Sequence, residues 1–269
     1  MTERMKPPVF RTVGTGWSDA FNAIGSMSGV AGVVYLILLP LAAAQVPLLD
    51  AALRDPQAFS FGHELTGIAI GIAQSFLLTP WAIVIHRYVL LGEVAQRYPF
   101  YPTHPRFLRF FGYTVAVMVM TAIPRLTFGP WPNLDRVSAV VLGIVGFTLM
   151  IVVLIVSVRI VIVFPSIAVD AAGADWRNAM RDSKGNFWRI FCIILLTVIP
   201  AGAVNFAVHW AVGKLLSGWP AIVVEALVTA AVSVAAIAAL AAIASRLFAA
   251  LADSLGPPSK LQAPRPATI

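Results

Sequence analysis

RIVIVFPSIAVDAAGADWRNAMRDSKGNFWRIF, residues 159–191, joins two long apolar segments and is the most distinctive part of the sequence. Pro165 and Gly173 interrupt it. Residues 175–184 then predict one short helix, which ends at Gly185 because glycine readily adopts the left-handed conformation that closes a helix. Apolar sequence resumes directly afterwards, so we expect this segment to turn the chain between two apolar helices.

The predicted helix 175–184 is amphipathic, since at about 100° per residue its side chains divide into one mainly apolar face and two polar flanks. The apolar face contains Trp176, Ala179, Met180 and Ser183, the basic flank Arg177, Arg181 and Lys184, and the acidic flank Asp175, Asn178 and Asp182. An aromatic face beside a basic flank is typical of a helix that lies in a membrane interface. We therefore interpret it as an amphipathic elbow helix on the cytoplasmic surface.

The composition indicates an integral membrane protein. The 269 residues are 59% hydrophobic and only 12% charged, with a mean hydropathy of +0.86, whereas a soluble domain carries about 25% charged residues. The net charge of +7 does not indicate a nucleic-acid partner, because the basic residues flank apolar segments and form no long run. The single cysteine, Cys192, excludes an intramolecular disulfide.

Six segments are long and apolar enough to cross a membrane, which needs about 20 residues per helix. The predicted spans are residues 25–49, 65–85, 107–126, 137–158, 187–208 and 221–248. The fold class predicted is therefore an all-α polytopic membrane protein with the elbow helix between spans four and five. Its domains are a cytoplasmic interfacial segment (1–24), a six-helix membrane domain (25–252) and a disordered cytoplasmic tail (253–269).

Charge predicts the orientation of these spans. The layout puts four of the 19 lysine and arginine residues, Arg54, Arg125, Arg136 and Lys214, opposite the termini, and the remaining 15 (19 minus 4) on the terminal side. Positively charged loops favour the cytoplasm. We therefore expect a multi-pass protein of the bacterial inner membrane with both termini cytoplasmic.

Short similarities favour an internal repeat of three helical hairpins. Alternate spans end in HRYVLL, VRIVIV and SRLFAA, and two of the entries into the membrane read RFLRFFGY and NFWRIFCI. The alternative is that aromatic and arginine residues recur at any membrane interface. Small residues at GxxxG spacing, Gly25 with Gly29 and Gly67 with Gly71, are expected to let helices approach closely.

No motif of reaction chemistry is present, so no catalytic, metal-binding or cofactor-binding residue is predicted. Basic and aromatic residues at the span ends form the candidate interface for anionic lipid. These residues are Arg87, Arg109, Arg159, Trp176, Arg177, Arg181, Lys184, Trp188, Arg189 and Arg246. For the arginines that end or begin spans, the positive-inside rule is an equally complete explanation.

Three polar residues are predicted within or near the membrane: Gln74, Asn205 and Glu225. Glu225 is expected at the outer end of the sixth span, in contact with water or paired with Arg125 or Lys214. A polar cavity around Gln74 and Asn205 would instead indicate a transporter or channel-like subunit.

The elbow also resembles a bacterial family. An arginine and an apolar, proline-bearing run to Pro165 lead into the pattern A-x-R-x-S-x-G-x-F-W-R, which Ala179 to Arg189 follow approximately as AMRDSKGNFWR. This is similar to YciC-like multi-span proteins and to the membrane domain that accompanies glycerophosphodiester phosphodiesterases. The resemblance implies a stand-alone membrane domain and carries over no catalytic residue.

The function predicted is that of a non-enzymatic inner-membrane protein associated with the envelope or its lipids, or acting as a membrane scaffold. Membrane lipids, anionic ones in particular, are the expected partners, with a homo-oligomer or a membrane-protein partner left open. The alternative is a transporter or channel-like subunit for a small solute or lipid.

Overall fold

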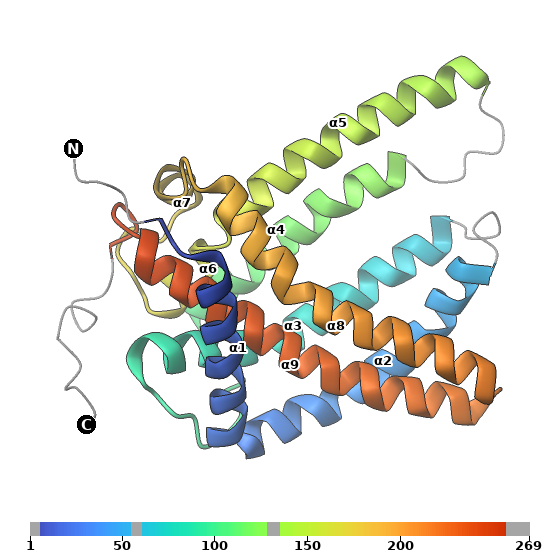
Figure 1. Ribbon diagram of the computed structural model, residues 1–269, viewed down its shortest axis with the longest axis horizontal. Helices are drawn as coiled ribbons and strands as arrows, with labels where there is room; N and C mark the ends of the chain where they lie inside the picture. The colour runs from blue at the N-terminus through green and yellow to red at the C-terminus, as the bar shows by residue number, and fades with distance from the viewer. Residues whose placement is uncertain (1–5, 55–60, 128–134, 257–269) are drawn as a thin grey trace.

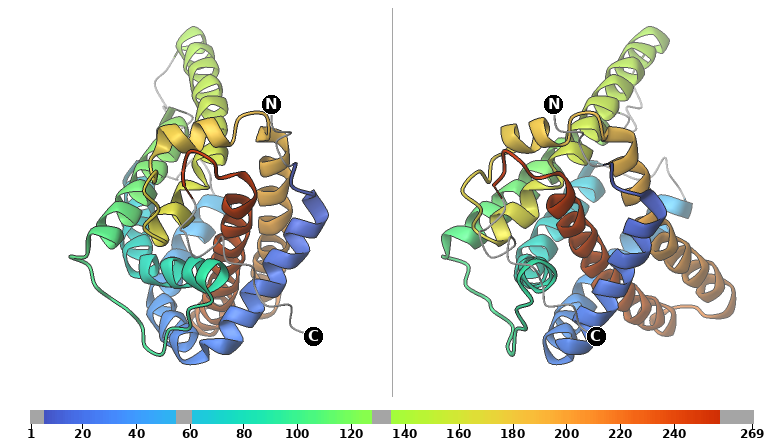
Figure 2. Two further views of the ribbon diagram at one scale, coloured as in Figure 1. Left: turned by 90° about the vertical axis from the view of Figure 1, so that its left-hand side faces the viewer. Right: turned by 60° about the vertical axis from the view of Figure 1, so that its left-hand side comes forward.

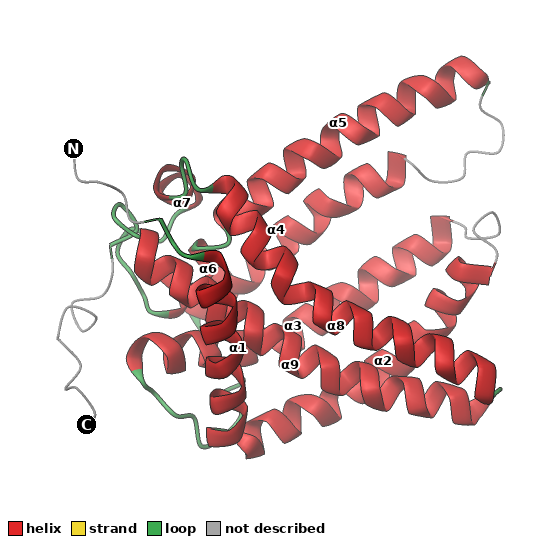
Figure 3. Ribbon diagram, in the orientation of Figure 1, coloured by secondary structure: helices red, strands yellow, loops and turns green. Residues whose placement is uncertain are grey.

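The computed structural model describes residues 6–54, 61–127 and 135–256, and this part of the chain contains helices and no strand (Figures 1 and 3). The helices are α1 (Val9–Ser26), α2 (Ser28–Arg54), α3 (Phe61–Leu91), α4 (Pro105–Thr127), α5 (Arg136–Ile160), α6 (Val163–Ala168), α7 (Trp176–Asp182), α8 (Phe187–Leu215) and α9 (Trp219–Leu251). The predicted all-helical fold class is confirmed.

Six of these helices, α2, α3, α4, α5, α8 and α9, are long and apolar enough to cross a membrane. Most run several residues beyond the predicted spans. Thus α3 continues past Arg87 to Leu91, because the residues that follow Arg87 are again apolar. A short helix, α7, forms within the predicted range 175–184. Its role as an elbow at a membrane interface and the three-hairpin repeat stay predictions.

The ends of the helices gather at two opposite ends of the molecule (Figure 1). Helices α1, α6 and α7 and the C-terminal end of α9 lie together at one end, which we call the terminal end (Figure 1). The C-terminal ends of α2, α4 and α8 lie at the opposite end, which we call the hairpin end (Figure 1). Toward the hairpin end α4 and α5 diverge from the other spans, and α5 projects outward in each view (Figures 1 and 2).

Helix α9 is the centre of the packing, because it contacts α1, α2, α3 and α8. Half of its buried positions are alanine, including Ala230, Ala238 and Ala242, each 0% exposed. Small side chains let helices pack closely where apolar burial gives no net driving force between them.

Helix α1 crosses α9 at the terminal end (Figure 2). Its buried residues are Thr12, Gly16, Ala20 and Ala23. Phe10 and Phe21, within the predicted interfacial segment 1–24, are exposed at 82% and 58%. A small-residue face therefore docks α1 on the bundle, with Trp17 packed against the core and Phe10 and Phe21 exposed.

The GxxxG expectation is wrong for Gly25, Gly29 and Gly67, because a Cβ at any of them would meet no atom within 4 Å in the part of the chain described. Gly71 does face a neighbouring helix, because a Cβ there would lie 2.7 Å from Cε of Met118 on α4. A closer approach occurs at Gly16, where a Cβ would lie 2.1 Å from Cγ1 of Ile243 on α9. Spacing alone could not distinguish the glycines that face a partner helix from those that face outward.

Candidate functional site

The elbow segment, which we define as residues 168–186, is tied to the end of α9 through its acidic flank. Asp182 is 3% exposed. Its carboxylate accepts hydrogen bonds from the backbone N–H groups of Asp253, Ser254 and Leu255 at 3.0, 3.1 and 2.9 Å. The prediction of a disordered tail from residue 253 is therefore wrong for these three residues, because a buried carboxylate holds them; residues 257–269 lie outside the described part.

Gly173 brings the elbow segment and the end of α9 into direct backbone contact. Its N–H donates to the carbonyl of Leu255 at 3.2 Å. A Cβ at this position would lie 2.2 Å from the carbonyl oxygen of Ser254. Glycine is therefore required here by close backbone approach, and its φ is not in the left-handed region.

Two of the predicted lipid-binding arginines instead hold the elbow segment in place. Arg159, at the end of α5, donates to the hydroxyl of Ser183 at 3.2 Å and to the carbonyl of Met180. Arg109, on α4, donates to the carbonyl of Ala174 at 2.6 Å. These carbonyls lie near the ends of short helical turns, where backbone acceptors lack helical partners.

The basic flank of α7 faces outward. Arg177, Arg181 and Lys184 are exposed, and the guanidinium carbon of Arg177 lies 5.6 Å from the ring centroid of Trp176. Trp176 is 47% exposed and Trp188, at the start of α8, is 72% exposed. The structure therefore gathers basic and aromatic side chains on one exposed surface.

The three other predicted arginines also have partners in the chain. Arg246 on α9 pairs with Asp19 on α1 at 2.6 and 2.9 Å. Arg189 is exposed and donates to the carbonyl of Pro7 at 3.3 Å. Arg87 forms a bidentate pair with Glu93, both bonds being 2.7 Å.

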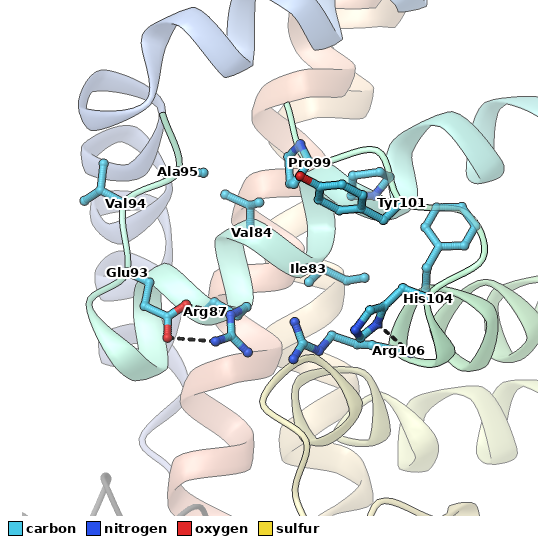
Figure 4. A pocket seen from close by; sticks show the side chains of 12 residues that line it. Ile83, Val84, Arg87, Glu93, Val94, Ala95, Pro99, Tyr101, His104 and Arg106 are labelled. Carbon is cyan, nitrogen blue, oxygen red and sulfur yellow. Dashed lines mark hydrogen bonds and ion pairs between the residues drawn. The ribbon is translucent and has the colours of Figure 1, made fainter. Parts of the chain in front are cut away.

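A cavity of about 380 Å³ lies between the end of α3, the loop 92–104 and the start of α4 (Figure 4). Its lining residues are Pro80, Ile83, Val84, Arg87, Glu93, Val94, Ala95, Pro99, Tyr101, His104, Arg106 and Phe107. The polar members lie along one side and the apolar members form the opposite wall (Figure 4).

Two carboxylates balance the two guanidinium groups of this cavity. Arg106 pairs bidentately with Asp170 in the elbow segment, its Nε lying 2.9 Å from Oδ1. Arg87 Nη1 lies 3.8 Å from the same carboxylate and donates to the carbonyl of Ala168 at 3.0 Å. Nδ1 of His104 accepts the backbone N–H of Arg106 at 3.2 Å, which leaves Nε2 as the protonated nitrogen of a neutral ring.

Asp170 is held in an unusual state by these contacts. Its φ is +54°, in the left-handed region that aspartate tolerates better than most residues. Partial burial acts to raise the pKa of Asp170, but the hydrogen bond from Arg106 and the positive charges of Arg106 and Arg87 outweigh burial and lower it below its ordinary value.

Sequence reasoning missed the cavity, including Glu93, His104, Arg106 and Asp170 as site residues. The available signal was the run YPFYPTHP at residues 98–105. Three prolines in eight positions exclude a continuous helix and restrict the loop. A conformationally restricted loop that joins two spans directly can hold its side chains in fixed positions, which favours a preformed site.

Two of the three predicted intramembrane polar residues, Gln74 and Glu225, find partners across helical hairpins. Nε2 of Gln45 donates to Oε1 of Gln74 at 3.0 Å, which joins α2 to α3. Glu225 is 6% exposed and lies 3.0 Å from Nδ1 of His209 on α8. In the described part of the chain, Oδ1 of Asn205 is buried and makes no hydrogen bond.

The expectation for Glu225 is corrected by this geometry. It is not a water-exposed carboxylate, and the ion pair formed is with His209 rather than with Lys214. The side chain of Arg125, the other predicted partner, lies outside the described residues. The correction arises because α8 and α9 run antiparallel and bring their facing positions together.

No group of three or more His, Cys, Asp or Glu side chains that could hold a metal ion occurs within residues 6–54, 61–127 and 135–256. Comparisons with models of known protein families, with curated proteins and with solved structures find no match. Six helices long and apolar enough to cross a membrane are compatible with a multi-pass integral membrane protein. The resemblance to YciC-like proteins stays a prediction.

Proposed function

We propose that the protein is a non-enzymatic, multi-pass protein of the bacterial inner membrane that associates with anionic lipid through α7. The observation that carries this proposal is the two-sided character of α7. Its acidic flank is anchored inside the protein through Asp182, while Arg177 and Arg181 are exposed beside the exposed ring of Trp176.

This arrangement fits the requirements of a helix at an anionic membrane surface. Tryptophan favours the interface, and each nearby basic side chain contributes about 1 kcal/mol of attraction to an anionic leaflet. Anchoring the opposite flank fixes which side of the helix meets the lipid, so little ordering is needed on contact. The excess of basic residues at the terminal end supports a cytoplasmic position for both termini.

The test is lipid binding by a variant that loses two charges from α7. We expect Arg177→Gln/Arg181→Gln to lower affinity for phosphatidylglycerol by roughly thirtyfold in low salt, the effect of about 2 kcal/mol. Native mass spectrometry of the purified full chain measures this affinity. Arg136→Gln/Lys214→Gln removes the same charge at the hairpin end and is the matched control. Equal affinity of the two variants would refute the proposal.

A transporter or channel-like subunit is the second candidate. It is favoured by the buried, unbonded Oδ1 of Asn205 in the described region, four positions before His209 on α8. Asn205→Cys in a Cys192→Ser background tests it, because a charged thiol reagent labels position 205 only if water reaches it. Complete protection from the reagent on both sides of proteoliposomes would exclude this candidate.

A further inference from the structure

The cavity beside Arg87 and Arg106 has the two-sided lining that an amphiphile requires. Arg87, Glu93, His104 and Arg106 form its polar side, and Ile83 and Val84 lie on the apolar wall (Figure 4). Phe107 is a further apolar lining residue. Its volume of about 380 Å³ lies within the range of small-ligand sites. A headgroup of a few polar atoms fits such a space with its first apolar carbons against the wall.

The cavity also lies at the depth where lipid headgroups are found. The membrane-compatible segments Gly62–Leu91 and Pro105–Pro124 respectively end and begin at the cavity, and the loop 92–104 closes it. The apolar lining residues Pro80, Ile83 and Val84 come from within the first segment, and Val94, Ala95 and Pro99 come from the loop. The polar side comes from the loop and from the adjoining ends of the two segments. An amphiphile entering from the bilayer would thus place its polar part among the charged side chains.

The charges of the cavity favour a particular kind of headgroup. Arg87 and Arg106 are matched by Glu93 and Asp170, so a net anion would have to displace a carboxylate from a guanidinium group. Arg106 bonds to Asp170 through Nε and Nη2, and in the described chain its Nη1 makes no hydrogen bond, so it is one available donor. The Nε2 N–H of His104 is a second donor. These donors suit a phosphate, which arginine binds well.

Glu93 supplies the complementary charge. Its carboxylate is 46% exposed, and each oxygen retains a lone pair beside its bond to Arg87. The exposed ring of Tyr101 lines the same cavity and offers a face that attracts cations. A group that carries both a phosphate and an ammonium would satisfy both sides without breaking either ion pair.

We propose that this cavity binds a zwitterionic phospholipid with a primary ammonium group, such as phosphatidylethanolamine. The phosphate lies against Arg106 and His104, the ammonium donates to Glu93, and the first apolar carbons pack on Ile83 and Phe107. The proposal rests on the membrane setting of the proposed function but not on α7, which is a separate surface.

The experiment measures binding of phosphatidylethanolamine, phosphatidylcholine and phosphatidylglycerol to the full chain by native mass spectrometry. We expect phosphatidylethanolamine to bind this site most tightly, because the choline group cannot donate a hydrogen bond to Glu93. Free phosphoethanolamine should compete poorly, since it lacks the apolar part. Equal binding of the ethanolamine and choline lipids, or equal binding of the free headgroup, would overturn the assignment.

Substitutions locate the two charges of the ligand. Glu93→Gln frees Arg87 and should reduce the preference for phosphatidylethanolamine over phosphatidylglycerol by about tenfold. Arg106→Gln should weaken both lipids by about tenfold. His104→Gln should weaken both by a smaller factor, and it keeps the test valid if Arg106→Gln unfolds. Arg97→Gln, on the same loop but outside the lining, is the matched control.

The two lipid proposals fail separately. Arg177→Gln/Arg181→Gln should leave the preference for phosphatidylethanolamine over phosphatidylcholine unchanged while it reduces phosphatidylglycerol binding at α7. If Glu93→Gln leaves the ratio of phosphatidylethanolamine to phosphatidylglycerol binding unchanged in folded protein, or if Arg106→Gln and His104→Gln leave both affinities unchanged, the cavity proposal is refuted whatever the α7 variants do. Apparent thermal midpoints of all variants identify any that do not fold.

Discussion

Replacing Asp182 by asparagine tests how the elbow segment is anchored. The Oδ2 atom accepts two backbone N–H groups, from Asp253 and Leu255, and Oδ1 accepts the N–H of Ser254. In Asp182→Asn the amide oxygen can take the position of Oδ2, but the NH₂ group then faces the N–H of Ser254. Two charge-assisted bonds become neutral ones, and one buried donor loses its acceptor.

The expected cost follows from these three bonds. A hydrogen bond to a charged group contributes about 1 kcal/mol more than a neutral one, and a buried unsatisfied donor costs about 1–3 kcal/mol. Asp182→Asn should therefore destabilise this contact by about 3–5 kcal/mol. That energy corresponds to a loss of roughly two to four orders of magnitude in hydrogen-exchange protection at residues 253–255.

The assay is amide hydrogen exchange of the detergent-solubilised protein, read for peptides that cover residues 253–255. Asp175→Asn is the control, because the Asp175 carboxylate accepts one long bond of 3.3 Å from the N–H of Arg177 and its loss should cost about 1 kcal/mol or less. Unchanged protection at residues 253–255 in Asp182→Asn would refute the reasoning.

Three further outcomes follow from single contacts. Gly16→Ala should destabilise the protein by about 1–3 kcal/mol through overpacking against Ile243. Adding Ile243→Ala to the same chain should recover part of the loss in apparent thermal midpoint. An unchanged midpoint in Gly16→Ala would contradict the observed packing. Because the pKa of Asp170 is lowered in the folded state, its stabilisation is complete above the ordinary carboxyl value of about 3.9 and is lost as pH falls through the folded value. The apparent thermal midpoint of Asp170→Asn should therefore fall less than that of the unaltered protein as pH is lowered below 6. Identical pH profiles of the two proteins would contradict this. Burial raises the pKa of Tyr98 to about 12, so an absorbance titration should show one tyrosine ionising near that pH, and Tyr98→Phe should remove that step.

The spans could be predicted because hydropathy is a local property. Every predicted span lies largely within an observed apolar helix, and the errors are a few residues at the ends. The division of the α7 side chains into two polar flanks could be predicted for the same reason, since helical periodicity alone separates Asp182 from Arg177. What periodicity could not show is which flank faces the protein, because the partner of Asp182 lies 71 to 73 positions away.

The partner of Glu225 was within reach of the sequence. In an antiparallel hairpin, positions equally distant from the turn face each other, and His209 and Glu225 each lie eight positions from residue 217. Gln45 and Gln74 are less symmetric, since Gln45 lies nine positions before the end of α2 at Arg54 and Gln74 lies thirteen positions after the start of α3 at Phe61. Polar residues at equal distances from a turn are thus a usable signal, whereas the pair Asp19 and Arg246, 227 positions apart, has none.

Several spans begin or end with an arginine. Besides their effect on topology, these arginines have a second role, which the contacts of the elbow segment show. Apolar helices gain little by associating in lipid, so polar contacts at their ends carry much of the specificity of packing. The segment receives such a contact from α3, α4, α5 and the end of α9, through Arg87, Arg106, Arg109, Arg159 and the N–H groups of residues 253–255. Its acceptors are backbone carbonyls, one hydroxyl and the carboxylates of Asp170 and Asp182. The elbow segment therefore helps to set the relative positions of four helices. The basic flank of α7 faces outward because its acidic flank is bonded to the rest of the protein through Asp182.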